Sequence, residues 1–219
     1  GGNRFEGVSA KKQGFFGADR NTFEQVAEAV GLIPREGPYA RWCRHPLAFL
    51  VEAADDIAYR VIDIEDGYRL GYFSYQEVTD AFLALLPEPQ RQRDRMQHIR
   101  QLKDRVEFLR AKVINQIISQ TLSCFLDNEQ AILEGSFDLP LLHELPCREP
   151  ADRLIEMAQN TIYCAPEVVS IQAAGFQVVG DLLERFIQVI DDVAERGDQA
   201  SPRSRMLIRL IPEQFIGPA

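Results

Sequence analysis

The sequence has little cysteine and little histidine, and no long apolar run. It contains four cysteines and three histidines in 219 residues, and no two cysteines form a CxxC pair. Scattered cysteines argue against a disulfide scaffold or a structural zinc site, and they are typical of reduced thiols in the cytoplasm. No apolar stretch reaches the roughly eighteen residues that a membrane span requires. These absences predict a cytoplasmic protein that has no membrane partner.

Positive charge is also scarce. Lysine and arginine number 24 against 33 aspartates and glutamates, and the net charge is −9. This balance argues against a protein whose main task is general nucleic-acid binding. One local basic stripe lies between Pro89 and Val113. It is interpreted either as the solvated face of a helix or as an anion surface for nucleotide or single-stranded DNA. Its members are Arg91, Arg93, Arg95, Arg100, Lys103, Arg105, Arg110 and Lys112.

The remaining composition is that of an ordinary globular protein. Hydrophobic residues make up 46% of the chain and charged residues 26%, and a chain of this length buries one good core. We therefore expect residues 1–219 to form a single helical domain. The apolar periodicity predicts an all-α fold. Helices are expected from Pro46 to Asp66 and from about Gln90 to Leu126, the second as one long helix that can bend. Ser74 and Glu77 are predicted to form a capping box for a helix that ends near Leu86. A short extended piece is expected at Val168 to Ile171, followed by a helix from Leu182 to Glu195 that Gly197 stops.

The most informative stretch is RHPLAFLVEAADDIAYRVIDIEDGYRLG, from Arg44 to Gly71. Pro46 suits the first turn of a helix, because a backbone N–H at that position would have no helical partner in any case. Gly67 is predicted to stop the helix. The helix carries six carboxylates among Leu, Val, Ile and Ala. At about 100° per residue, Asp55, Tyr59 and Asp63 step along one face.

Two interpretations of these acids remain open. An acidic strip on an amphipathic helix is usually a solvated face. Carboxylates kept in an apolar helix can instead serve a site, because burying one without a partner costs several kcal/mol. Tyr59 among the acids favours the second interpretation, since an aromatic ring with a polar tip suits a ligand-facing wall.

The run EAADDIAY followed by IDIEDG closely resembles the deoxyguanosine-triphosphate triphosphohydrolase family, part of the helical phosphohydrolases named for a His-Asp (HD) metal motif. Two further segments resemble the same family in the same order: KKQGFFGADRNTFEQVAEAVGL, from Lys11, and LRAKVINQIISQTLSCFLDNEQAILEGSF, from Leu109. The resemblance implies a multi-helical HD-domain-type bundle.

The resemblance also implies roles for individual residues. In that family a divalent metal, Mg, Mn or Fe, is held by a His, a His-Asp pair and a later Asp. By position the later Asp matches Asp55, and Asp56 is the neighbour that a shift of one residue would substitute. Tyr59 matches a wall of the nucleotide pocket and Asp63 a polar position near the sugar. Lys12 and, more weakly, Arg110 match segments of the family that contact the phosphates.

The histidines depart from the family pattern. None of the three is followed by Asp. His45 stands before Pro46 and suits a capping or structural role, His98 lies in a charged run, and His143 lies near prolines. The chain thus supplies one metal ligand of four. We expect a C-terminal part of a longer HD-domain chain, with a segment missing after residue 7, so that the catalytic histidines lie outside these residues.

The resulting functional expectation is metal-dependent hydrolysis of a deoxynucleoside triphosphate, with dGTP as the foremost substrate, to deoxynucleoside and inorganic triphosphate. The resemblance implies a homo-oligomer, and single-stranded DNA is a possible further partner. Two alternatives stay open. One is a related phosphohydrolase that acts on another nucleotide. The other is a catalytically inactive protein that binds nucleotide and regulates a partner.

Overall fold

The protein is all-α, as the periodicity predicts. The computed structural model describes residues 15–35, 41–212 and 215. Within those residues there is no strand, and the sole β-type contact is an isolated bridge between Pro34 and Trp42. The helices are α1 (Arg20–Ala29), α2 (Pro46–Arg69), α3 (Tyr75–Leu83), α4 (Pro89–Gln97), α5 (Leu102–Asp127), α6 (Glu129–Leu133), α7 (Arg148–Thr161), α8 (Pro166–Arg196) and α9 (Pro202–Leu207), with short 3-10 turns between some of them.

The chain divides into two compact units where the sequence analysis expects one domain. The first unit is Gly1–Ile162 and the second is Tyr163–Ala219. In the part of the chain that is described, no single helix is both long and apolar enough to cross a membrane. The helices α7 and α8 reach that length and composition only when taken together across a bend.

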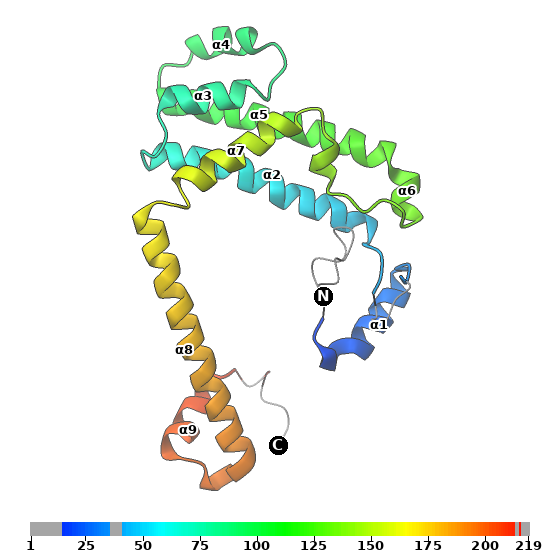
Figure 1. Cartoon of the computed structure of the whole chain (residues 1–219), viewed down its shortest axis with the longest axis vertical. Helices are drawn as coiled ribbons and strands as arrows, with labels where there is room; N and C mark the ends of the chain where they lie inside the picture. The colour runs from blue at the N-terminus through cyan, green and yellow to red at the C-terminus, as the bar shows by residue number, and fades with distance from the viewer. Residues whose placement is uncertain (1–14, 36–40, 213–214, 216–219) are drawn as a thin grey trace, which may run out of the picture. The chain divides into compact units, whose positions relative to one another are not determined.

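The core of the first unit forms around α2. The helices α5 and α7 both contact α2, and α3 contacts α5 and α7 (Figure 1). Each helix turns one apolar stripe into this core, which is what their roughly 3.6-residue spacing of apolar side chains predicts. The fully covered side chains include Val61 and Ile64 of α2, Val78 and Phe82 of α3, Val106, Leu109, Val113 and Ile117 of α5, and Leu154 of α7.

The start of α2 agrees with the prediction and its end does not. Pro46 occupies the first turn, and the His45 side chain accepts the Leu47 N–H at 3.2 Å, so the capping role of His45 is confirmed. Gly67 does not stop the helix. A Cβ there would lie 2.7 Å from the Phe73 ring and 2.8 Å from the Ile162 side chain, so glycine lets these side chains approach the helix. The stop is Gly71, whose positive φ of 83° begins a Schellman turn.

The capping box at the start of α3 is confirmed. The Ser74 hydroxyl accepts the Glu77 N–H at 3.3 Å, and the Glu77 carboxylate accepts the Ser74 N–H at 2.8 Å. These bonds to the backbone and side chain of Ser74 hold the pKa of Glu77 below its ordinary value of 4.5. Each side chain thus accepts a backbone N–H that has no hydrogen-bond partner within the first turn of the helix.

This capping box predicts an acid-dependent loss of stability. A carboxylate whose pKa is lowered by folding stabilises the native state above its unfolded pKa, and that stabilisation disappears as the pH falls through the folded pKa. In urea titrations between about pH 5 and pH 3 we expect the wild-type midpoint to fall more steeply than that of Glu77→Gln. Glu129→Gln, at an exposed position on α6, should keep the wild-type slope. Equal slopes in all three proteins would contradict the prediction.

Two predicted elements are wrong. The long helix expected from Gln90 to Leu126 is broken between α4 and α5, although the linking segment has neither Pro nor Gly. The break is stabilised by Arg105, whose Nε donates to the Ile99 carbonyl at 2.7 Å. The extended piece expected at Val168 to Ile171 is instead part of α8, a helix of 31 residues that begins at Pro166. An isolated strand there has no neighbour for its backbone groups, whereas a helix satisfies them internally.

In the second unit α8 turns back into α9. The predicted stop at Gly197 is confirmed, with a φ of 53° that favours glycine. Asp192 of α8 accepts the Ser201 N–H at 2.9 Å, and Ser201 caps α9 by accepting the Ser204 N–H at 3.0 Å. Hydrogen bonds from Ser204 and Ser201 lower the pKa of Asp192. The carboxylate thereby ties the two helices of this unit together.

Candidate functional site

The candidate site lies on α2, which has a buried and an exposed side. The buried side packs into the core through Phe49, Ala53, Ile57, Val61 and Ile64. The exposed side carries apolar and acidic residues together. Val51 is 69% exposed, Tyr59 63% and Ile62 41%, and Asp55 lies among them on the helix. Single exposed apolar side chains are normal on a protein surface, whereas several on one helix face can mark a surface for a ligand or a partner.

Asp55 is exposed on this strip, and Tyr59 lies one turn further along the same side. Neither hydrogen bond nor ion pair joins Asp55 to another described residue. Asp63 is half-buried on the flank of the strip. The three residues predicted to share one face of the helix therefore lie along one side of α2, with Asp63 at its more buried edge. Lys12 lies outside the described residues.

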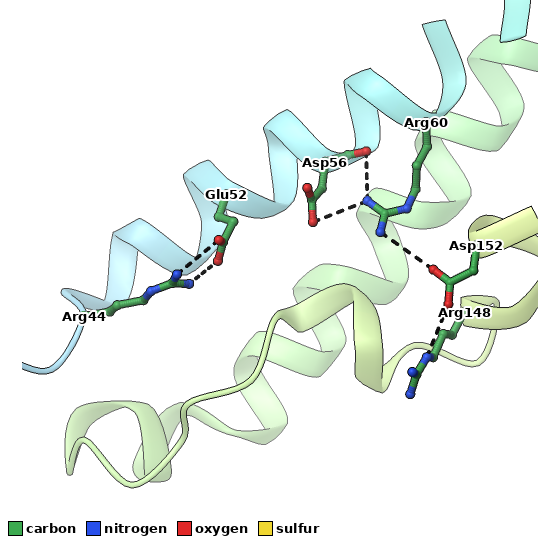
Figure 2. A network of polar contacts seen from close by, with 6 residues as sticks. All are labelled: Arg44, Glu52, Asp56, Arg60, Arg148 and Asp152. Atoms are coloured by element: carbon green, nitrogen blue, oxygen red, sulfur yellow. Dashed lines mark hydrogen bonds and ion pairs between the residues drawn. The ribbon is translucent and has the colours of Figure 1, made fainter. Parts of the chain in front are cut away.

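Four other carboxylates of α2 lie close to arginines. The longest of these ion pairs joins Asp66 to Arg69 at 3.9 Å. Glu52 is held by both terminal nitrogens of Arg44, one of them at 3.1 Å (Figure 2). Asp56 pairs with Arg60 at 3.3 Å. Glu65 has its side chain only 2% exposed, and it pairs with Arg69 at 2.9 Å and with Arg110 at 2.5 Å. These acids have structural partners, which distinguishes them from Asp55.

Arg110 therefore lies against Glu65, between α5 and α2. Its role towards phosphate stays a prediction. Its side chain is 34% exposed. A guanidinium has five N–H donors, so one contact with Glu65 leaves further donors. Within the basic stripe, Arg91 pairs with Glu88 at 2.8 Å and Arg93 with Asp80 at 2.7 Å. These pairs favour the interpretation of the stripe as a solvated helix face.

An apolar groove of about 320 Å³ lies between α2 and α5. Its wall includes Ala54 and Ala58, which precede Asp55 and Tyr59 in the sequence, and Ile118 and Leu122 of α5. The sequence analysis does not find this groove, because the residues that form it come from two helices whose pairing no local pattern shows. The groove makes the side of α2 next to Asp55 apolar.

Comparison with known proteins agrees with the resemblance seen in the sequence. No family model matches the chain. A deoxyguanosinetriphosphate triphosphohydrolase-like protein from Synechocystis sp. is 41% identical over 217 residues, which is 98% of this chain and 47% of that protein. The chain belongs to the deoxyguanosinetriphosphate triphosphohydrolase family. A triphosphohydrolase-like protein from Listeria monocytogenes is 27% identical, over 96% of this chain and 46% of its own length. A deoxyguanosinetriphosphate triphosphohydrolase from Klebsiella pneumoniae is 28% identical, over 80% of this chain and 36% of its own length.

The chain spans about half the length or less of these triphosphohydrolase relatives. Similarity to the Synechocystis protein runs through both compact units, because it covers 98% of the chain.

The described residues of this chain offer only part of what a divalent metal site needs. Asp55 offers one exposed carboxylate, an oxygen donor of the kind that Mg and Mn prefer. In residues 15–35, 41–212 and 215, no group of three or more His, Cys, Asp or Glu side chains comes together to hold an ion. His98 and His143 are exposed, and His45 caps α2. Asp55 can be one ligand of a metal and does not bind it firmly alone.

Arg60 is the residue of this region that the sequence analysis misses. Its side chain is 8% exposed and charged, at a position of α2 that an amphipathic pattern would give to an apolar residue. One local signal was present, because Asp56 lies four residues earlier and such pairs meet on a helix. Its second partner, Asp152 of α7, becomes visible only when the two helices are brought together.

Proposed function

We propose that the complete polypeptide, of which these 219 residues are all or part, hydrolyses a deoxynucleoside triphosphate to deoxynucleoside and inorganic triphosphate, with dGTP as the foremost substrate. Hydrolase activity in general is supported by the names of the triphosphohydrolase relatives. The observation that carries the proposal is Asp55, an exposed carboxylate that pairs with no arginine among the described residues, on a helix where four other acids do.

The proposed reaction breaks the bond between the α-phosphorus and the 5′ oxygen of the sugar. Water supplies the oxygen that bonds to phosphorus, and a proton goes to the departing 5′ oxygen. A bound divalent metal, Mg, Mn or Fe, would supply Lewis-acid stabilisation of the phosphate charge. Asp55 would be one of its ligands, with further ligands from residues outside those described.

The remaining predicted residues would bind the nucleotide. The Tyr59 ring, 63% exposed, offers a flat apolar surface for the base or sugar, and Asp63 a hydrogen-bond acceptor for a sugar hydroxyl. Lys12 and Arg110 would neutralise phosphate charge, Lys12 as a compact cation and Arg110 with the donors that Glu65 leaves open. None of these contacts places a general acid or base, so no residue is assigned that role.

A homo-oligomer is part of this proposal. It is supported by α8, whose exposed large apolar side chains include Phe176 at 82%, Leu183 at 60% and Ile187 at 56%. Extended exposed apolar surfaces of soluble proteins commonly mark interaction sites. The second unit thus offers a helix surface suited to another subunit.

The test is product analysis on the complete polypeptide with Mn²⁺ and each of the four deoxynucleoside triphosphates. We expect deoxyguanosine and inorganic triphosphate from dGTP, and a loss of at least about 100-fold in Asp55→Ala, as for removal of a group that contacts the reacting phosphates. The control is Asp66→Ala, because Asp66 is also an exposed aspartate of α2 and its side chain makes a surface ion pair with Arg69 at 3.9 Å. It should retain wild-type turnover.

The alternatives give different products. Release of orthophosphate or a nucleoside monophosphate in place of triphosphate would favour a phosphohydrolase of another specificity. Intact nucleotide binding without any hydrolysis would favour the regulatory protein and would overturn the proposed activity.

A further inference from the structure

Asp55 and Asp56 are adjacent in the sequence and have opposite surroundings. Asp55 is exposed and makes no ion pair with the described residues, whereas Asp56 is half-buried and faces Arg60. Because successive residues of a helix point about 100° apart, one rotation of α2 cannot direct both carboxylates to the same ligand. Whatever fixes that rotation decides which aspartate faces outward.

Arg60 joins α2 to α7 next to these two aspartates, in addition to the apolar contacts of the core face of α2. One terminal nitrogen donates to the Asp56 carbonyl at 3.2 Å and lies 3.3 Å from the Asp56 carboxylate. The other terminal nitrogen lies 3.7 Å from the carboxylate of Asp152 on α7 (Figure 2). The buried Nε has no hydrogen-bond partner in the described part of the chain. The charge of this buried guanidinium is therefore compensated through Asp56 and Asp152.

These contacts connect two helices. Asp56 and Arg60 belong to α2, and Asp152 belongs to α7, where it also accepts a bond from Arg148 at 3.4 Å. A guanidinium is planar and presents its donors in fixed directions, so it can meet two carboxylates at once in a defined geometry. Sliding or rotating α2 against α7 would separate Arg60 from Asp152 and leave a buried charge poorly compensated.

We infer that Arg60 is a positioning residue: by binding Asp56 and Asp152 together it commits Asp56 to the contact with α7 and keeps Asp55 turned outward as the ligand-facing carboxylate. The inference rests on the proposed role of Asp55 towards a divalent cation. It also assigns the two neighbouring aspartates different tasks, which excludes Asp56 as the metal ligand.

The test is a Mn²⁺ titration of the complete polypeptide without nucleotide, with far-UV circular dichroism and thermal unfolding recorded in parallel. Arg60→Lys keeps the positive charge but replaces the fork with a single ammonium. We expect Arg60→Lys to weaken Mn²⁺ binding by roughly tenfold, the effect typical of residues that orient a metal ligand. Asp152→Asn, at a partly exposed position, should give a smaller loss in the same direction and serves if Arg60→Lys does not fold.

Two further variants make the inference falsifiable. Asp56→Asn should lower the thermal midpoint and weaken Mn²⁺ binding far less than Asp55→Asn does. Arg148→Ala, at the exposed end of the network, should change the Mn²⁺ affinity by less than about twofold.

Unchanged Mn²⁺ affinity in folded Arg60→Lys and Asp152→Asn would overturn the positioning role. A loss in Asp56→Asn as large as that in Asp55→Asn would also overturn it, because Asp56 would then be a ligand itself. Full Mn²⁺ binding by Asp55→Asn would instead contradict the proposed function, so the two failures are distinguishable.

Discussion

Arg110→Met is expected to lower the free energy of unfolding by about 3 kcal/mol, the low end of what breaking a buried ion pair costs. The reason is Glu65, whose side chain is 2% exposed and lies 2.5 Å from Arg110. Removing the arginine leaves that buried carboxylate with one ion-pair partner among the described residues, Arg69 at 2.9 Å. The half-exposed Arg69 also contacts Glu107 at 3.2 Å, so it offers only partial compensation.

The double variant Glu65→Leu/Arg110→Met provides the control. It removes the buried carboxylate together with its counter-ion, and replacing both members of a buried pair by apolar side chains is often neutral or stabilising. We therefore expect the double variant to be markedly more stable than Arg110→Met alone. Equal destabilisation of the two proteins would show that lost packing, and not an uncompensated charge, causes the effect.

Urea unfolding of the 219-residue chain measures both variants, and the chain contains a suitable probe. Trp42 is the single tryptophan and it lies in the first unit, with its ring 5.1 Å from that of Phe23. Its fluorescence therefore reports on the unit that contains Glu65 and Arg110. Far-UV circular dichroism follows the helices of both units, so a difference between the two signals identifies separate transitions.

Local signals of the sequence were sufficient for much of the fold. Pro46 and the Ser74–Glu77 capping box begin helices where predicted, because a cap is decided by residues within one turn. Gly67 shows where local reasoning fails. A glycine after a helix pattern looks like a stop, and here it is a contact position for Phe73 and Ile162, which approach from elsewhere in the fold.

Local reasoning also misses the break between α4 and α5. The segment has no Pro or Gly to indicate it, and the Ile99 carbonyl is satisfied by the side chain of Arg105, six residues further along. The same distinction between local and long-range information applies to the candidate site. The spacing of Asp55, Tyr59 and Asp63 on α2 could be predicted from the helical period alone. The sequence could not show which acids have partners. Arg110 and its partner Glu65 are 45 residues apart, and Asp152, a partner of Arg60, lies on another helix, α7. Residue types and helical faces are local properties, whereas charge pairing depends on how the helices come together.

Leu109→Ala is expected to lower the free energy of unfolding by about 2–5 kcal/mol, the range for truncating a well-packed core leucine. Leu109 is 0% exposed and belongs to α5, a helix that contacts both α2 and α3. The loss combines the transfer of the removed atoms out of the core with the cavity that remains. The measurement is the same urea titration by Trp42 fluorescence and circular dichroism.

Leu126→Ala is the matched control, because it is the same substitution in the same helix at a side chain that is 64% exposed. A surface substitution of this kind changes stability by less than about 0.5 kcal/mol. If Leu126→Ala were as destabilising as Leu109→Ala, the exposed end of α5 would be covered in solution by another surface, and a concentration-dependent unfolding midpoint would identify that surface as a second copy of the chain. A small effect at Leu109 would contradict the placement of α5 in the core, because the helix face that carries Leu109 would then be solvated.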